Sequence, residues 1–180
     1  MATFAYRGQL NSSEEPVIVP MLVANSQTVT VGSAVKTQSF ASGSGVMAAT
    51  AGSKIAGIVA GLVDNVGIDF SNTKQTYTGT YTKSTKTYVA SATNTTVDLI
   101  KALVIVDPMA LFENKSAGNL AVADTYKFFD LTSASQIADQ DGADAAGAFQ
   151  LIKLDPSALS DATVGLFRMA ENELFNYVQQ

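Results

Sequence analysis

Along much of the chain, apolar and polar residues alternate with the period of two that is typical of β-strands. The alternation is clearest over residues 75–81, where Tyr77, Gly79 and Tyr81 fall on one face and threonines on the other. Further short strands are predicted over residues 28–31, 34–37, 86–90, 149–154 and 163–169. Turns separate these strands at intervals of about 8–12 residues, a spacing typical of sandwiches and barrels. The pattern therefore predicts an all-β fold, a small β-barrel or sandwich.

The stretch from Lys54 to Gly67, KIAGIVAGLVDNVG, has three glycines among small apolar residues and admits three interpretations. A phosphate-binding loop needs a lysine and a serine or threonine after its second glycine, but Leu62-Val63-Asp64 follows Gly61. A membrane helix needs about 20 apolar residues, which is more than this run contains. As a strand, the stretch has apolar or small residues on both faces. We predict a core strand covered on both sides, ending in a turn.

Three other segments are less regular. Residues 95–106 fit a helix or a strand, and the β-branched end followed by Asp107-Pro108 favours a strand. Residues 124–131 mix aromatic and charged side chains and fit either a short helix or a strand. The Ser/Gly-rich residues 39–45 and the Ala/Asp/Gly-rich residues 136–148 are predicted to be loops.

The first residues of the chain lack this alternation. Residues 1–15 are mixed and polar, and Pro16 and Pro20 favour an extended path over a helix. We therefore expect an extended N-terminal arm over residues 1–25. Residues 26–180 are expected to form a single β-rich domain with a C-terminal tail.

Composition narrows the possible chemistry. The chain has no cysteine and no histidine, which removes thiolate metal sites, cysteine nucleophiles and the commonest general base. A net charge of −5 gives no electrostatic footprint for nucleic acid. No apolar run is long enough to span a membrane, and no secretory signal is present, so we expect a soluble product made in a cytoplasm. Charged residues make up only 15% of the chain, which indicates that much of its surface contacts other protein.

The charges are unevenly distributed along the chain. Residues 71–101 contain four lysines and one acid, whereas residues 102–180 contain eleven acids and four bases. This asymmetry could favour docking of one subunit's basic edge against a neighbour's acidic face. Two independently solvated surfaces would explain it equally well.

Several short motifs carry candidate chemistry. Ser71 and Lys74 match the S-x-x-K spacing of some acyl-transfer enzymes, but the companion motifs are missing, so a surface turn is favoured. Asp139, Asp141 and Asp144 resemble a calcium loop, yet the EF-hand spacing fails, which favours a solvated acidic loop. We therefore predict no metal site, no cofactor and no catalytic residue.

Two other motifs concern sugars. Asn94-Thr95-Thr96 fits a glycosylation acceptor, which has no support without an export signal. Tyr77, Tyr81 and Tyr88, near Lys83 and Lys86, could stack on bases or sugars. Aromatic pairs across strands of a sheet explain these tyrosines more simply.

The order of the motifs resembles that of a known group of proteins. They are I-A-G-I-V-A-G-L-V-D-x-x-G at residues 55–67, V-D-P-x-x-L-F-E at 106–113, L-x-x-L-D-P-S at 151–157 and E-N-E-L-F at 171–175. Over most of residues 28–176 the chain resembles the small β-rich head proteins of tailed bacteriophages, especially marine phages: the capsid decoration, or cement, proteins. The resemblance implies a β-tulip-like fold and a non-enzymatic protein on the capsid exterior of the virion. It also implies the major capsid protein as a partner, and self-association as a homotrimer.

The expected contact surfaces are the two ends of the chain, because neither end has a clear core role. Extended arms commonly add a strand to a neighbour's sheet edge. The expected contact residues are Thr3, Phe4, Tyr6, Arg7, Pro16, Val17 and Val19 in the arm, and Leu174, Phe175 and Tyr177 in the tail over residues 173–180. The alternatives are a phage tail, fibre or carbohydrate-binding β module that uses Tyr77 and Tyr81, and a hydrolase that uses Ser71 with Lys74 or the Asp cluster.

Overall fold

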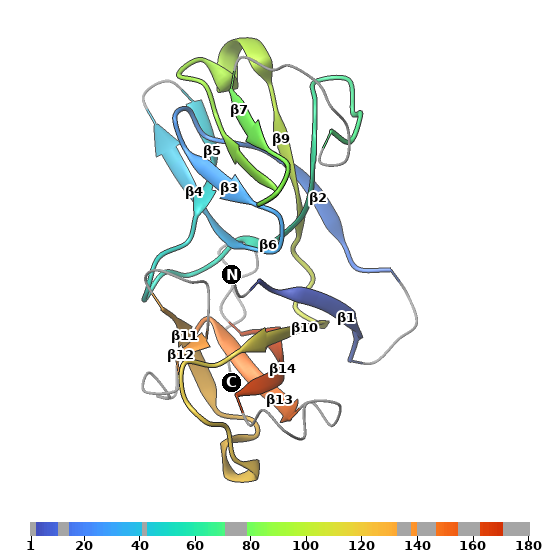
Figure 1. The fold of residues 1–180 in the computed structure, drawn as a ribbon, viewed down its shortest axis with the longest axis vertical. Helices are drawn as coiled ribbons and strands as arrows, with labels where there is room; N and C mark the ends of the chain where they lie inside the picture. The colour runs from blue at the N-terminus through green and yellow to red at the C-terminus, as the bar shows by residue number, and fades with distance from the viewer. Residues whose placement is uncertain are drawn as a thin grey trace.

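The described residues form three antiparallel sheets (Figure 1). The computed structural model describes residues 3–10, 15–40, 43–70, 79–132, 138–139, 147–154 and 163–170. The all-β, sandwich-like fold predicted from the sequence is confirmed. Within the described ranges, no helix has the length and apolar character needed to cross a bilayer.

A six-stranded sheet lies in the lower half of Figure 1. Its strand order is β1 (Ala5–Gln9), β10 (Ala110–Lys115), β14 (Val164–Met169), β13 (Phe149–Leu154), β11 (Phe128–Leu131) and β12 (Ala138–Asp139). Along β11 and β14, buried side chains alternate with half-buried ones, because one face of the sheet covers the core. The strands predicted over residues 149–154 and 163–169 are confirmed, and they pair with each other.

A five-stranded sheet and a three-stranded sheet lie in the upper half. The five-stranded order is β2 (Ile18–Leu22), β9 (Lys101–Ile105), β6 (Gly57–Val63), β4 (Ala34–Phe40) and β5 (Gly43–Ala48). The three-stranded order is β3 (Thr28–Thr30), β8 (Thr87–Val89) and β7 (Thr80–Thr82). The loop predicted over residues 39–45 is shorter than expected, since β4 extends to Phe40 and β5 begins at Gly43.

The ambiguous segments are now assigned. Residues 95–106 are divided between a short π-helical turn, η1 (Asn94–Asp98), and β9. Residues 124–131 begin at the end of a 3₁₀ turn, η2 (Val122–Asp124), and continue into β11. Each of the two segments that fitted either a helix or a strand therefore contains a β-strand.

Two apolar clusters hold the sheets together. The first is rich in phenylalanine and lies on the inner face of the six-stranded sheet: Phe4, Phe112, Phe129, Phe149 and Phe167. The second lies between the five-stranded and three-stranded sheets and includes Val29, Val59, Leu62, Tyr88 and Val104. The five-stranded sheet contributes residues to both clusters.

Strand β6 is the doubly covered core strand that its sequence predicted. It supplies Ile58 to the first cluster and Val59 to the second. A Cβ on Gly57 would overlap the carbonyl oxygen of Ile105 and lie 2.6 Å from Val104 Cγ1, so glycine is required by close packing. The predicted strict alternation fails at one point. Because the register with β9 slips between Val59 and Gly61, the residues beyond the slip change face.

The extended arm expected over residues 1–25 is not confirmed in its described part. Strand β1 pairs with β10 at one edge of the six-stranded sheet, and β2 pairs with β9 at one edge of the five-stranded sheet. Phe4, Val23 and Ala24 are buried. The physical reason is that one large aromatic side chain and two short pairings bury enough surface to fix a segment whose own pattern looks polar.

Candidate interaction groove

A groove of about 980 Å³ opens between the first residues of the chain and the centre of the five-stranded sheet. Its lining is mainly apolar and comes from the N-terminal segment, from the turns at residues 30–32 and 84–86, and from strands β6, β9 and β10. The lining residues are Thr3, Phe4, Tyr6, Glu15, Pro16, Ile18, Thr30, Val31, Gly32, Ile58, Val59, Ala60, Ser84, Thr85, Lys86, Ile105 and Phe112.

Ala60 contributes the exposed part of β6 to this groove. It is the extra residue at the slip in register between β6 and β9, and such a bulge turns a side chain away from the pleated pattern. Ala60 is exposed, whereas the other residues of β6 are buried. The bulge therefore opens a central strand to solvent at the position where the groove lies.

Phe4 anchors the N-terminal wall of the groove. Its ring stacks on Phe149 with centroids 4.6 Å apart and meets Phe112 edge-on at 6.3 Å. Its backbone N–H donates to the carbonyl of Gly32 at 2.7 Å. Gly32 has a φ of +83°, and a Cβ there would lie 2.9 Å from Thr3 Cβ, so glycine allows the two segments to approach.

Two lysines stand at the turn between β7 and β8. Lys83 and Lys86 are exposed, and Lys86 lines the groove. The turn is tied to the adjoining wall because Val31 N–H donates to the carbonyl of Lys86 at 3.0 Å. Neither lysine has an ion pair within the described part of the chain. Glu15 supplies an acidic side chain to the same groove.

Four of the expected contact residues meet at this groove, namely Thr3, Phe4, Tyr6 and Pro16. Phe4 differs from the expectation, because its side chain is only 4% exposed and belongs to the core. Tyr6 is 38% exposed and packs edge-on against Phe112 at 6.2 Å. Tyr6 and Ile18, which is 45% exposed, are two apolar side chains of the lining that a partner could reach.

The other expected contact residues lie elsewhere. Arg7 forms an ion pair with Glu113 at 2.9 Å across β1 and β10. Val17 is 55% exposed beside β2, and Val19 is partly buried against the second cluster. Leu174, Phe175 and Tyr177 lie outside the described residues. Sequence reasoning missed Ala60 and Lys86, since a bulge and a turn folded back onto another strand leave no periodic signal.

Of the three tyrosines proposed for stacking, Tyr88 is buried and Tyr81 is half-buried. Tyr81 and Tyr88 are partners across β7 and β8, as the aromatic-pair interpretation predicted. Tyr88 is fully buried, and Phe70 meets both rings edge-on at 5.5 and 5.8 Å. Burial, and then the nearby negative charge of Asp69, raise the pKa of Tyr81. Tyr77 lies outside the described residues.

Asn94 is a buried structural residue. Its Nδ2 donates to the carbonyls of Val23 and Ile100, and its Oδ1 accepts from the Ile100 N–H and the Tyr88 hydroxyl. These bonds use both sides of the amide, which is fully buried. A glycan could not be attached to this nitrogen in the folded protein.

The remaining candidate residues lie mostly outside the described ranges. Asp139 is paired in register with Asp130 across β12 and β11, whereas Asp141, Asp144, Ser71 and Lys74 lie outside the described ranges. No group of three or more acidic side chains that could hold a metal is found in the part that the structure describes.

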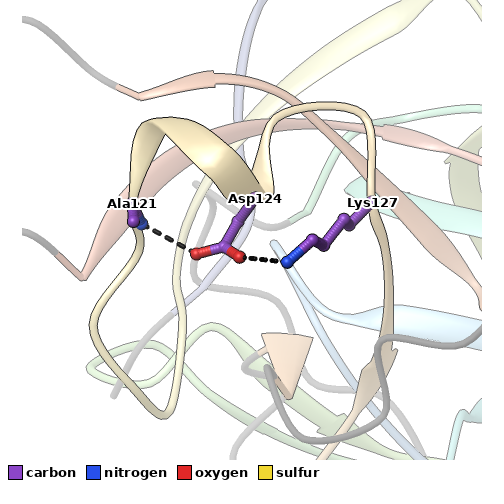
Figure 2. A network of polar contacts seen from close by, with 3 residues as sticks. All are labelled: Ala121, Asp124 and Lys127. Carbon is purple, nitrogen blue, oxygen red and sulfur yellow. Dashed lines mark hydrogen bonds and ion pairs between the residues drawn. The ribbon is translucent and has the colours of Figure 1, made fainter.

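A polar network fixes the turn before β11 (Figure 2). The carboxylate of Asp124 accepts from the Ala121 N–H at 2.8 Å and pairs with Lys127 Nζ at 2.7 Å. The turn leaves Val122 78% exposed and Tyr126 67% exposed. Neither side chain lines the groove beside β1, which is the stronger candidate surface because it is lined from several elements.

Comparisons with protein-family models, curated proteins and solved structures found no match for this chain.

Proposed function

We propose that this protein is a non-enzymatic virion structural protein that binds the outer surface of a bacteriophage capsid and stabilises the shell. The observation that carries the proposal is the apolar groove of about 980 Å³ with Tyr6 and Ile18 exposed beside it. Grooves of this size can take several side chains of a peptide partner. The motif order that resembles capsid decoration proteins supplies the partner, the major capsid protein.

The mode of contact follows from the edge positions of β1 and β2. Both strands end their sheets, so a segment of the capsid protein can add alongside either strand while its side chains enter the groove. Pro20 lies in β2 and lacks an N–H, which makes β1 the better edge for such pairing. In this proposal the expected homotrimer forms on the shell, where symmetry places copies side by side.

Stabilisation of the shell follows from mass action. A protein that binds the assembled capsid but not its dissociated subunits stabilises the assembly by its binding free energy at every occupied site. Each copy can bind modestly, because the contributions add over many equivalent sites. The protein then needs an interface and no reactive group, which agrees with a chain that lacks cysteine and histidine.

The test is sedimentation of the purified protein with capsids stripped of their outer proteins. The variant Ile18→Asp places a charge beside the groove, and we expect it to weaken binding by roughly tenfold or more, about 1.4 kcal/mol. Val122→Asp is the matched control, because Val122 is 78% exposed and does not line the groove. Absence of parental binding to capsids, or equal binding by both variants, would contradict the proposal.

A tail, fibre or carbohydrate-binding role has less support. It relied on Tyr77 and Tyr81, and Tyr81 is partly buried against the second cluster, where Phe70 meets its ring edge-on. Binding of the purified protein to host glycans, together with no binding to capsids, would favour this alternative. Loss of glycan binding in Tyr81→Phe would then assign it to that face.

A further inference from the structure

We propose that the groove has a ligand within the same chain: the C-terminal segment over residues 171–180, ENELFNYVQQ. This inference concerns an intramolecular contact, and only its consequence for capsids rests on the proposed function. Three observations support it: the place where the described chain ends, the apolar side chains of the segment, and the charges beside the groove.

The described chain ends close to the groove. Met169, at the end of β14, is the register partner of Phe149 on β13, and Ala170 N–H donates to the carbonyl of Ala148 at 2.9 Å. The ring of Phe149 stacks on Phe4, which lines the groove, at 4.6 Å. The side chains of Met169, Phe149 and Phe4 are buried, so the segment must reach the groove over the surface. There the end of β14 is two strand spacings, about 10 Å, from β1, because β10 pairs with both strands.

The segment is long enough for this path. Ten residues follow Ala170, and an extended chain of ten residues reaches at most ~33–36 Å. A tether this short holds the segment near the groove at an effective concentration on the order of millimolar. Even a weak contact would then be occupied within one molecule in preference to contacts between molecules.

The composition of the segment matches that of the groove. Leu174, Phe175 and Tyr177 are apolar or aromatic, and aromatic side chains bury roughly 150–250 Å² each when they pack. The groove offers Tyr6 and Ile18, which are 38% and 45% exposed, together with the bulged Ala60. Burying both surfaces against each other removes apolar area that would otherwise stay in water.

The charges of the segment and of the groove also favour this contact. Glu171 and Glu173 precede the apolar residues of the segment. Lys83 and Lys86 stand exposed at the β7–β8 turn, and Lys86 lines the groove. Glu15 also lines the groove and would repel the two acids, so they are expected to lie on the lysine side. The contact should weaken as salt concentration rises.

The consequence is competition at the capsid. If the capsid protein enters the same groove, it must displace the segment first. Its apparent dissociation constant is then the intrinsic constant divided by the fraction of molecules in which the groove is open. Replacing Leu174, Phe175 and Tyr177 with serine should therefore tighten capsid binding. Free protein would keep its apolar groove covered and expose it on the shell.

The direct test uses a fluorescent reporter in the full chain. Because the sequence contains no tryptophan, Tyr6→Trp places a single tryptophan at the groove, which can be excited selectively in the presence of the tyrosines. We expect its emission maximum to move to longer wavelength when Leu174, Phe175 and Tyr177 are replaced by serine. Adding a synthetic ENELFNYVQQ peptide to that serine variant should return the emission towards that of the chain with the parental C-terminal segment.

Val122→Trp is the matched reporter, since Val122 is 78% exposed and lies outside the groove lining. Its emission should not respond to the serine substitutions. Unchanged Tyr6→Trp emission in a serine variant that circular dichroism shows to be folded would overturn the proposal. So would an emission shift that depends on protein concentration, because that would assign the contact to two different molecules.

This measurement is independent of capsids. If the reporter responds to the serine substitutions but the protein does not bind capsids, the intramolecular contact is supported and the proposed function is rejected. If the protein binds capsids but the reporter does not respond, the proposed function is supported and the intramolecular contact is rejected.

Discussion

Replacing Phe4 with alanine distinguishes a core strand from an extended arm, because the two assignments predict different stabilities. Phe4 is 4% exposed and stacks on Phe149 at 4.6 Å. Burial of an aromatic side chain removes roughly 150–250 Å² from water, worth about 4–6 kcal/mol at ~25 cal/mol per Å². Measured Phe→Ala changes in cores cost about 3–5 kcal/mol. We expect a loss of ~3–5 kcal/mol in the free energy of unfolding.

Urea unfolding followed by circular dichroism measures this loss, and thermal unfolding should show a fall of roughly 6–20 °C. Val17→Ala is the control, because Val17 is in the same N-terminal segment but is 55% exposed, and a change there should stay within about 0.5 kcal/mol. If Phe4→Ala and Val17→Ala have equal stability, Phe4 is not part of the core and the N-terminal segment behaves as an arm.

Three further predictions concern the two clusters. Gly57→Ala forces a Cβ to 2.6 Å from Val104 Cγ1 and should cost about 1–3 kcal/mol or more in the same urea assay, whereas Gly52→Ala, where no atom lies within 4 Å, should cost less despite its φ of +68°. Asn94→Ala leaves buried carbonyl and N–H partners without the amide and should cost about 2–4 kcal/mol; an unchanged midpoint would refute the structural role of that amide. Because the folded pKa of Tyr81 is raised above its ordinary value of 10, its contribution is present below pH 10 and is lost as pH rises through the folded pKa. Tyr81→Phe should therefore lose less thermal stability than the parent as the pH rises above 10, and parallel curves would contradict the shift.

The β-strands were predictable wherever the signal is local. Strand β6 has small or apolar residues on both faces and is closed by a turn, and β13 and β14 flank a clear break in the pattern. These features depend on neighbours in sequence, which is all that a period of two can report. The bulge at Ala60 was not predictable, since it arises only from the register with β9.

The N-terminal strands were not predictable for a related reason. The partner of β1 is β10, about a hundred residues later, and their register shifts between Tyr6 and Gly8. That irregularity hides the alternation in AYRGQ. A single buried aromatic, Phe4, then fixes the segment against the six-stranded sheet, and one phenylalanine gives no periodic signal.

The candidate site was predicted in part. The sequence pattern gives Thr3, Phe4, Tyr6 and Pro16 no core role and so predicts them as contact residues, and the structure brings all four to one groove. Phe4, however, has a core role, and its buried ring forms part of the groove wall. The lysine at position 86 comes to the same place only because its turn folds back beside β3, which no spacing in the sequence encodes.

The double role of the N-terminal segment decides which experiments can test its contacts. Deleting residues 2–15 would remove β1 and Phe4 together, so a loss of capsid binding could report a damaged core instead of a lost interface. A valid test changes only a side chain that is already in water. Ile18 meets that condition because it is 45% exposed and lines the groove, and a charge there should leave the urea midpoint nearly unchanged while it weakens binding. If Ile18→Asp lowers stability as much as Phe4→Ala does, then the groove is part of the folding core, and no substitution within it separates binding from folding.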